Sequence, residues 1–440
     1  MRLINTSTFE LETFYDIRTR PKYSILSHTW TNNEVVYEEY RPGDVADERS
    51  FRRGYEKINK ACHYARSQRY EYIWIDTCCI DKRSSAELSE AINSMWRWYK
   101  ESAICFAYLA DVPYSETYLE KKQVKISEDS RMAFEVFTGS RWFTRGWTLQ
   151  ELIAPKTVHF LSSEWQFIGS KYTLRDAIIV ASGIDGLYLH ADEASSCSTY
   201  IKMSFAARRQ TTREEDMAYC LLGLFGINMP LLYGEGKRAF TRLQLAIVEA
   251  QHDPTCTVLA WSDNSFEPQK QPFQTDDHSF PCFAASAAHF PPLEIETVAD
   301  IGRHLFSGSS IRPYSMTNIG LHITLPVVGI PEEERAVEGL TEHLLGFYAI
   351  VGRVYEGIQE RSYVAIPIFC FSVDSVVLRH TEVVEDTVFH RSRPSIVLLT
   401  GKDLARSKEL RFYLGQRYRT IPPRLWKPLP AMSCPDNEDD

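Results

Sequence analysis

Three short apolar runs, separated by segments with helical spacing, constrain the fold of this chain more than any other feature. The runs occupy residues 23–27, 70–76 and 104–110, and each is followed by polar residues. Between them, residues 54–69 and 84–99 carry apolar side chains at helical intervals. Strands and helices that alternate at this pitch form a parallel sheet with helices on its faces. We therefore predict an α/β fold for the N-terminal part of the chain.

Polar and aromatic side chains gather where these runs end. In parallel sheets, ligands bind beside the carboxyl ends of the strands. The residues that the pattern places there are Ser27, His28, Trp30, Asp76, Asp81 and Asp111. His28 is equally well explained as a core histidine with satisfied hydrogen bonds, and Asp76 as the cap of a turn.

The segment 141–152 places a glutamate, Glu151, four residues after a tryptophan, Trp147. On a helix this spacing puts both side chains on one face. Because the neighbouring residues are largely apolar, the carboxylate either pairs with Arg141 or Arg145 or has a chemical role. The residues alone leave both alternatives open.

The rest of the chain is predicted to be helical first and β-rich after about residue 255. Helices are expected at 171–182, at 198–207, from a capping box at Thr212 and Glu215, and at 240–250. After about residue 255, short apolar runs punctuated by glycine and proline indicate a β-rich region. We predict four parts: an α/β domain (1–160), a helical extension (161–254), a β-rich domain (255–430) and an acidic disordered tail (431–440).

Composition bears on location and partners. The net charge of -9, without a long basic run, argues against nucleic-acid binding. The most apolar segment, residues 217–233, is interrupted by glycine and proline, so we expect buried helix and loop and no membrane span. The ten cysteines lack any Cys-x-x-Cys pair, as in a reduced cytoplasmic protein. We expect no metal and no cofactor.

A glycine pair at Gly234 and Gly236 fits a dinucleotide fingerprint in spacing. However, Pro230 lies where the first strand of that motif should be. We therefore do not assign a nucleotide site to these glycines.

Several blocks together resemble the fungal heterokaryon-incompatibility (HET) domain family. They are Tyr-Ser-Ile-Leu-Ser-His-Thr-Trp (23–30), Trp-Ile-Asp-Thr-Cys-Cys-Ile-Asp-Lys (74–82), Ala-Tyr-Leu-Ala-Asp-Val (107–112) and Arg-Trp-Phe-Thr-Arg-Gly-Trp-Thr-Leu-Gln-Glu-Leu (141–152). The family is itself similar to Toll/interleukin-receptor (TIR) domains, which implies a flavodoxin-like or TIR-like parallel sheet with flanking helices. The resemblance also implies fungal non-self recognition that triggers programmed cell death, self-association, and other incompatibility or signalling proteins as partners.

In TIR domains of plant receptors, a tryptophan followed four residues later by glutamate cleaves NAD. The resemblance therefore implies that Glu151 is catalytic and that NAD is the substrate. The residues expected to bind it are Ser27, His28, Trp30, Asp76, Asp81, Arg145 and Trp147. One carboxylate suffices for this reaction, because nicotinamide leaves a cationic pyridinium as a neutral base and requires no general acid. The alternative is a non-enzymatic interaction module that recruits cell-death effectors.

Overall fold

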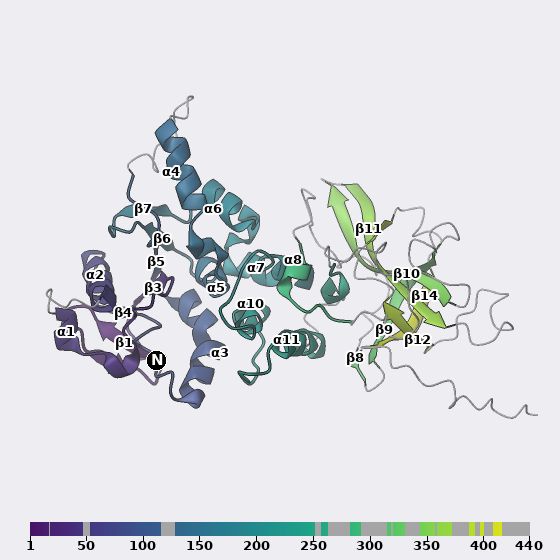
Figure 1. Cartoon of the computed structure of the whole chain (residues 1–440), viewed down its shortest axis with the longest axis horizontal. Helices are drawn as coiled ribbons and strands as arrows, with labels where there is room; N and C mark the ends of the chain where they lie inside the picture. Colours follow the sequence, from purple (N-terminus) through teal and green to yellow (C-terminus); the bar gives the residue numbers. More distant parts are fainter. Residues whose placement is uncertain are drawn as a thin grey trace, which may run out of the picture.

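The computed structural model describes residues 1–16, 18–46, 53–115, 128–250, 257–262, 282–291, 315–317, 320–330, 344–356, 359–371, 387–391, 397–399 and 408–415. Figure 1 shows an N-terminal sheet with its helices, a helical segment beside it, and a second sheet in the C-terminal part. The predicted α/β character of the N-terminal part is confirmed.

The N-terminal sheet has seven strands in the order β2-β1-β4-β3-β5-β6-β7. Their bounds are Arg2–Asn5 (β1), Leu11–Thr13 (β2), Ser24–His28 (β3), Tyr72–Trp74 (β4), Ile104–Tyr108 (β5), Val158–Leu161 (β6) and Phe167–Ser170 (β7). The runs at 23–27, 70–76 and 104–110 correspond to β3, β4 and β5, in that order. β3 pairs in parallel with both β4 and β5, and β6 pairs in parallel with β5.

The sheet is mixed, whereas the sequence predicted a parallel one. The pairs β1–β2, β1–β4 and β6–β7 are antiparallel. These edge strands have only three or four residues each, which is too short for alternation to show in the sequence. β7 joins the sheet from beyond residue 160, so the sheet continues into the segment predicted as the helical extension.

The order of the parallel strands locates a crevice. From β3 the chain goes to β4 on one side and then to β5 on the other side of β3. Such a reversal of direction is where α/β sheets bind ligands, at the carboxyl ends of the strands. β3 and β5 pair from Ser24 and Ile104 through to His28 and Tyr108, so their carboxyl ends lie level.

The helices of the first part confirm most of the expected boundaries. They are α1 (Pro42–Ala46), α2 (Arg53–Ser67), α3 (Ser85–Glu101), α4 (Glu128–Thr138) and α5 (Thr148–Ile153). Ser84 caps α3 by accepting from the backbone N–H of Glu87 at 3.3 Å. The Glu87 carboxylate does not return to Ser84; it binds Arg2 and the backbone N–H of Asp81.

In the described residues after the sheet, the α-helices are α6 (Arg175–Ser182), α7 (Ala191–Ser196), α8 (Thr199–Ser204), α9 (Asp216–Tyr219), α10 (Leu222–Phe225) and α11 (Arg238–Glu249). Gly226 ends α10 with a φ of 64°, a left-handed conformation that glycine adopts readily.

The capping box predicted at Thr212 and Glu215 is wrong. The Glu215 carboxylate instead accepts from the backbone N–H groups of Gly234 and Gly236, at 2.7 and 3.0 Å.

The described C-terminal strands form a second sheet in the order β10-β11-β12-β14-β9-β8, with β13 paired to β11. They are β8 (Ser315–Met316), β9 (Gly320–Gly329), β10 (Leu344–Glu356), β11 (Gln359–Phe371), β12 (Thr387–Arg391), β13 (Val397–Leu399) and β14 (Lys408–Gly415). The tail predicted at 431–440 lies outside the described residues.

Short 3-10 helices complete the described elements: η1 (Tyr37–Glu39), η3 (Arg141–Thr144), η4 (Gly186–Leu189), η5 (Thr257–Leu259) and η6 (Ala287–His289). One of the apolar runs expected in the β-rich region lies at residues 256–261. Its described residues contain the helical turn η5 and no strand. Within the described ranges, no helix has both the length and the apolar composition needed to cross a bilayer.

Candidate functional site

A pocket of about 420 Å³ lies at the carboxyl ends of the parallel strands. This volume is within the range typical of small-molecule sites. Six of the residues predicted for a site line it together: His28, Trp30, Asp76, Arg145, Trp147 and Glu151. Apolar side chains from α3 and the loop before it, Ile80, Leu88, Ile92 and Met95, also line it.

Three predicted residues, Ser27, Asp81 and Asp111, lie outside the pocket lining. The Asp111 carboxylate accepts from Ser140 Oγ and from the backbone N–H of Arg141, each at 2.8 Å. Ser27 lies behind the pocket wall, where its hydroxyl donates a hydrogen bond to the Glu151 carboxyl. Asp81 faces elsewhere: its carboxylate accepts from Arg83 at 3.2 Å, and its backbone N–H binds Glu87. The spacing after β4 therefore brought Asp76, but not Asp81, to the site.

Glu151 is the most deeply placed acid in the pocket, with only 8% of the residue exposed. The indole N–H of Trp142 donates to Ser27 Oγ at 2.8 Å, so the Ser27 proton is directed toward Glu151. The Tyr99 hydroxyl, which donates to the Leu26 carbonyl at 3.1 Å, is also hydrogen-bonded to Glu151. A protonated Glu151 satisfies this network, because it can donate to the Tyr99 oxygen while it accepts from Ser27.

Neither arginine suggested by the sequence pairs with Glu151. Arg141 donates to Thr29 Oγ1 at 3.2 Å, and Arg145 donates to Thr212 Oγ1 at 3.4 Å. Among the residues that the structure describes, Glu151 takes part in no ion pair. Burial, assisted by the charge of Asp76, raises the pKa of Glu151 to about 8, although the hydrogen bonds with Ser27 and Tyr99 and the charge of Arg209 act to lower it. Near pH 7 the acid is therefore mainly protonated.

Asp76 is held in the opposite protonation state. Burial alone would raise its pKa, but the hydrogen bonds from His28 and Trp30 and the charge of Lys82 outweigh burial, and the pKa of Asp76 is lowered. The Trp30 indole N–H donates to Oδ2 at 2.9 Å, and His28 Nε2 lies 3.1 Å from Oδ1. Asp76 and Glu151 are thus an ionised and a neutral acid in the same pocket.

His28 belongs to a chain of polar groups and is almost fully buried. The Lys57 ammonium, which can only donate, lies 3.2 Å from His28 Nδ1 and also binds Glu34. Nδ1 is therefore the acceptor, and Nε2 carries the proton that is donated to Asp76. His28 is both a satisfied histidine and a pocket residue, so the two alternatives left open by the sequence are compatible.

The second wall of the pocket comes from the segment after residue 200, which sequence reasoning assigned no role. Arg213, Asp216 and Tyr233 line it. The Tyr233 hydroxyl donates to Asp216 Oδ1 at 3.0 Å, and Trp147 also hydrogen-bonds to Asp216. Burial raises the pKa of Asp216 despite these bonds. The only signal in the sequence was the Thr-Thr-Arg-Glu-Glu-Asp block at 211–216, which does not by itself indicate a contact with Trp147.

The glycine pair at Gly234 and Gly236 positions Tyr233 and leaves no free anion site. Both glycines have positive φ values, 102° and 59°. Their N–H groups point at the Glu215 carboxylate, which occupies the place that a phosphate would take in a nucleotide loop. This arrangement agrees with the prediction that these glycines do not form a nucleotide site.

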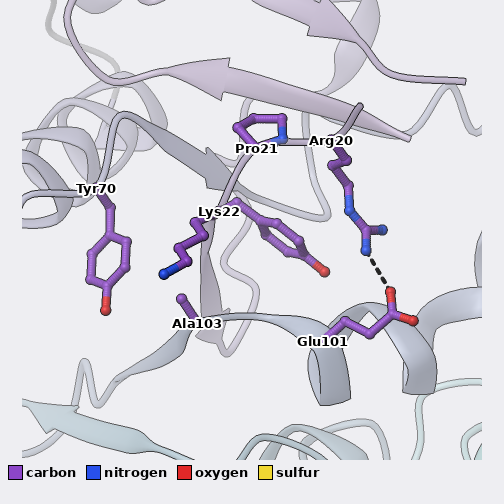
Figure 2. Close-up of a pocket in the computed structure, with 7 residues that line it drawn as sticks. Arg20, Pro21, Lys22, Tyr70, Glu101 and Ala103 are labelled. Atoms are coloured by element: carbon purple, nitrogen blue, oxygen red, sulfur yellow. Dashed lines mark hydrogen bonds and ion pairs between the residues drawn. The ribbon is translucent and has the colours of Figure 1, made fainter. Parts of the chain in front are cut away.

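A larger pocket of about 510 Å³ lies at the opposite, amino ends of β3 and β5, lined by residues 20–23, Tyr70, Glu101 and Ala103. Figure 2 shows Arg20 turned toward Glu101, with which it forms an ion pair. Lys22 is exposed at its edge. The charged side chains here are paired or exposed to solvent, unlike Glu151.

The N-terminal part of this chain is similar to a known protein family. Residues 23–151 match the family described as "Heterokaryon incompatibility protein (HET)", and this match ends at Glu151. The chain is also similar to the "Vegetative incompatibility protein HET-E-1" of Podospora anserina, with 44% identity over 227 residues. That alignment covers 51% of this chain and 16% of the relative, so the chain spans about a sixth of the relative's length. No solved structure matches the chain.

The alignment with this relative is longer than the stretch that matches the family. The similarity therefore continues outside residues 23–151. This agrees with a pocket whose walls come from both sides of Glu151 in the sequence.

Proposed function

We propose that this chain is a cytoplasmic signalling protein of fungal non-self recognition that triggers programmed cell death, and that its HET domain cleaves NAD on self-association. The family match and the relative's printed name support the role in incompatibility. The parallel strands β4-β3-β5-β6 have the order 2-1-3-4, which supports the flavodoxin-like and TIR-like interpretation. Its partners are other incompatibility or signalling proteins and not nucleic acid.

One observation carries the enzymatic proposal: Glu151 is buried in the pocket and has no ion-pair partner among the described residues, and Trp147 lines the same pocket. A carboxyl group that only stabilised the fold would be expected to pair with a nearby arginine. Arg141 and Arg145 are available nearby, yet each is directed to a threonine hydroxyl.

The reaction balances with the groups present. The bond between ribose C1′ and the pyridinium nitrogen breaks, and its electron pair neutralises the nicotinamide ring, which leaves. Ionised Glu151 stabilises the positive charge that develops on the ribose. A water molecule then adds its oxygen to C1′ and loses a proton, which gives ADP-ribose, nicotinamide and one proton.

The raised pKa of Glu151 suits a cationic substrate. The acid is mainly neutral near pH 7 because burial disfavours its charge. A pyridinium ring placed beside it supplies a positive charge, which lowers the pKa and favours the carboxylate. The substrate itself would thus ionise the acid that it needs.

The test is NAD consumption by the purified full chain, alone and after fusion to a domain that enforces clustering. We expect nicotinamide and ADP-ribose to appear on clustering, and toxicity in cells to be accompanied by a fall in NAD. Unchanged NAD in the clustered protein would contradict the enzymatic proposal. NAD loss that persists in Glu151→Gln would remove Glu151 from the mechanism.

A second candidate, a non-enzymatic module that binds partner domains and recruits effectors, is favoured by a different observation. The protonated Glu151 already has partners in Ser27 and Tyr99, as a structural acid would. This candidate predicts no NAD turnover in the clustered protein and toxicity that depends on surface residues outside the pocket.

A further inference from the structure

A half-buried lysine in the pocket has an ammonium group that is buried and makes no hydrogen bond within the described residues. Lys82 lies in the loop between β4 and α3, and its Nζ atom is buried without a hydrogen bond to any residue that the structure describes. The atom lies 3.5 Å from the centre of the Trp30 ring, a cation–π contact. A buried ammonium without hydrogen bonds costs free energy, which an anion in the pocket would offset.

Two arginines line the same pocket from other segments. Arg145, before α5, makes the long hydrogen bond to Thr212 already described. Arg213, before α9, lies with its guanidinium carbon 4.5 Å from the centre of the Tyr233 ring. Within the described ranges, none of the three cations lies at ion-pair distance from a carboxylate. Three separate parts of the chain therefore bring unpaired positive charge to one cavity.

The acids of the pocket offset this charge only in part. Asp76 is ionised, but its two oxygens are already occupied by His28 and Trp30. Glu151 is mainly neutral near pH 7, and the Asp216 carboxyl group is hydrogen-bonded to Tyr233 and Trp147. The pocket therefore has an excess of positive charge and donors that are free to bind an anionic ligand.

Flat apolar surface lies beside these cations. The polar atoms of Trp30, Trp147 and Tyr233 are each hydrogen-bonded to an aspartate, Asp76 or Asp216. These bonds fix the orientation of the three rings before any ligand arrives. A nucleotide combines a flat base with charged phosphates. Oriented aromatic rings suit the base, and cations beside them suit the phosphates.

We propose that Lys82, Arg145 and Arg213 form a subsite for the diphosphate of a nucleotide, with the aromatic side chains of the pocket receiving its ring. The inference deepens the proposed function, because it assigns the part of NAD that does not react. It requires only binding, so it stands or falls independently of cleavage. Lys82 and Arg213 are specificity residues that the sequence did not suggest.

The test is calorimetric titration of the full chain with ADP-ribose, inorganic pyrophosphate and nicotinamide riboside, at two salt concentrations. ADP-ribose is not consumed, so binding is measured whether or not the protein is an enzyme. Lys82→Met is compared with Arg83→Gln, which removes a positive charge from the neighbouring exposed residue, paired with Asp81 and Glu38 outside the pocket. Arg213→Met is the second pocket variant.

We expect ADP-ribose to bind more tightly than pyrophosphate or nicotinamide riboside, and more weakly at high salt. Lys82→Met should weaken ADP-ribose binding at least tenfold and Arg213→Met several-fold, with Arg83→Gln within twofold of the wild type. Lys82→Met should also melt at the same or a higher temperature, because it removes an unpartnered buried charge. A lower melting temperature would show that the lysine serves the fold.

Three results would overturn the subsite: no binding of ADP-ribose, equal affinity for pyrophosphate and ADP-ribose, or equal losses in Lys82→Met and Arg83→Gln. The outcomes also separate this inference from the proposed function. Tight ADP-ribose binding without NAD cleavage keeps the subsite and rejects the enzyme. NAD cleavage with a KM unchanged in Lys82→Met and Arg213→Met keeps the enzyme and rejects the subsite.

Discussion

The pocket at the amino ends of β3 and β5 has a volume of about 510 Å³, whereas the pocket at their carboxyl ends has about 420 Å³. In the larger one, Arg20 is paired with Glu101 and Lys22 is exposed. In the smaller one, Glu151 is buried without an ion pair, and Lys82 has no hydrogen-bond partner in the described part of the chain. Strand direction and burial, and not volume, distinguish the candidate site from an ordinary surface hollow.

The strongest test of this contrast is one isosteric change in each pocket. Glu151→Gln should lower the rate of NAD cleavage by the clustered chain at least about 100-fold, because a charge-stabilising group is lost. Glu101→Gln, at the other end of the sheet, should stay within twofold of the wild type. Nicotinamide release measured by chromatography gives both rates. Equal losses in the two variants would mean that the carboxyl-end pocket has no special role.

The protonation of Glu151 gives a second difference that does not depend on activity. Its folded-state pKa of about 8 lies above the ordinary value of 4.5, so the folded protein binds the extra proton between these pH values. Stability is then lost as the pH rises through that window. We expect the free energy of unfolding of the wild type, relative to Glu151→Gln, to fall on the order of 3 kcal/mol from pH 5 to pH 8.

Urea unfolding at several pH values measures this difference. The Glu101→Gln variant should follow the wild-type curve, since its side chain does not share the buried environment of Glu151. Parallel curves for wild type and Glu151→Gln would show that the carboxyl group is solvated in the folded protein, which contradicts the burial on which the site depends.

A third prediction concerns the lysine that supports the Glu151 helix. Lys171 Nζ donates to the carbonyl oxygens of Ile153 and Pro155 at 3.2 and 2.9 Å, and burial lowers the pKa of Lys171 to about 7. Lys171→Met leaves these carbonyls without their donor and should destabilise the chain by about 1–3 kcal/mol. Lys22→Met is the matched change in the exposed pocket and should have no measurable effect. Chemical denaturation that shows similar stabilities for both variants would contradict the supporting role of Lys171.

The smallest effect is expected at the amino-end ion pair. Arg20→Gln removes the contact with Glu101 and should cost at most about 1 kcal/mol, because partly exposed pairs contribute little. NAD cleavage should be unchanged. A large loss of activity in Arg20→Gln, with normal melting, would indicate that the larger pocket also takes part in function.

Local sequence patterns determined the central strands, most helices and the shared face of Trp147 and Glu151. These features depend on the periodicity of neighbouring residues, so they can be read without a fold. The resemblance to HET domains, confirmed for residues 23–151, likewise rests on contiguous blocks. The short edge strands β1, β2 and β7 were missed because three or four residues show no period.

Tertiary structure alone decided what surrounds Glu151. Ser27 is 124 residues away in sequence, yet it supplies the hydrogen bond, whereas the nearby Arg141 and Arg145 turn to threonines. Asp216 and Tyr233 reach Trp147 from the segment beyond the sheet, and Lys82 Nζ is buried against Trp30 without a hydrogen bond to any described residue. The spacing of two residues in the sequence determines whether their side chains lie on the same face of a helix. The burial and partners of a side chain arise from contacts between distant segments, which no local pattern contains.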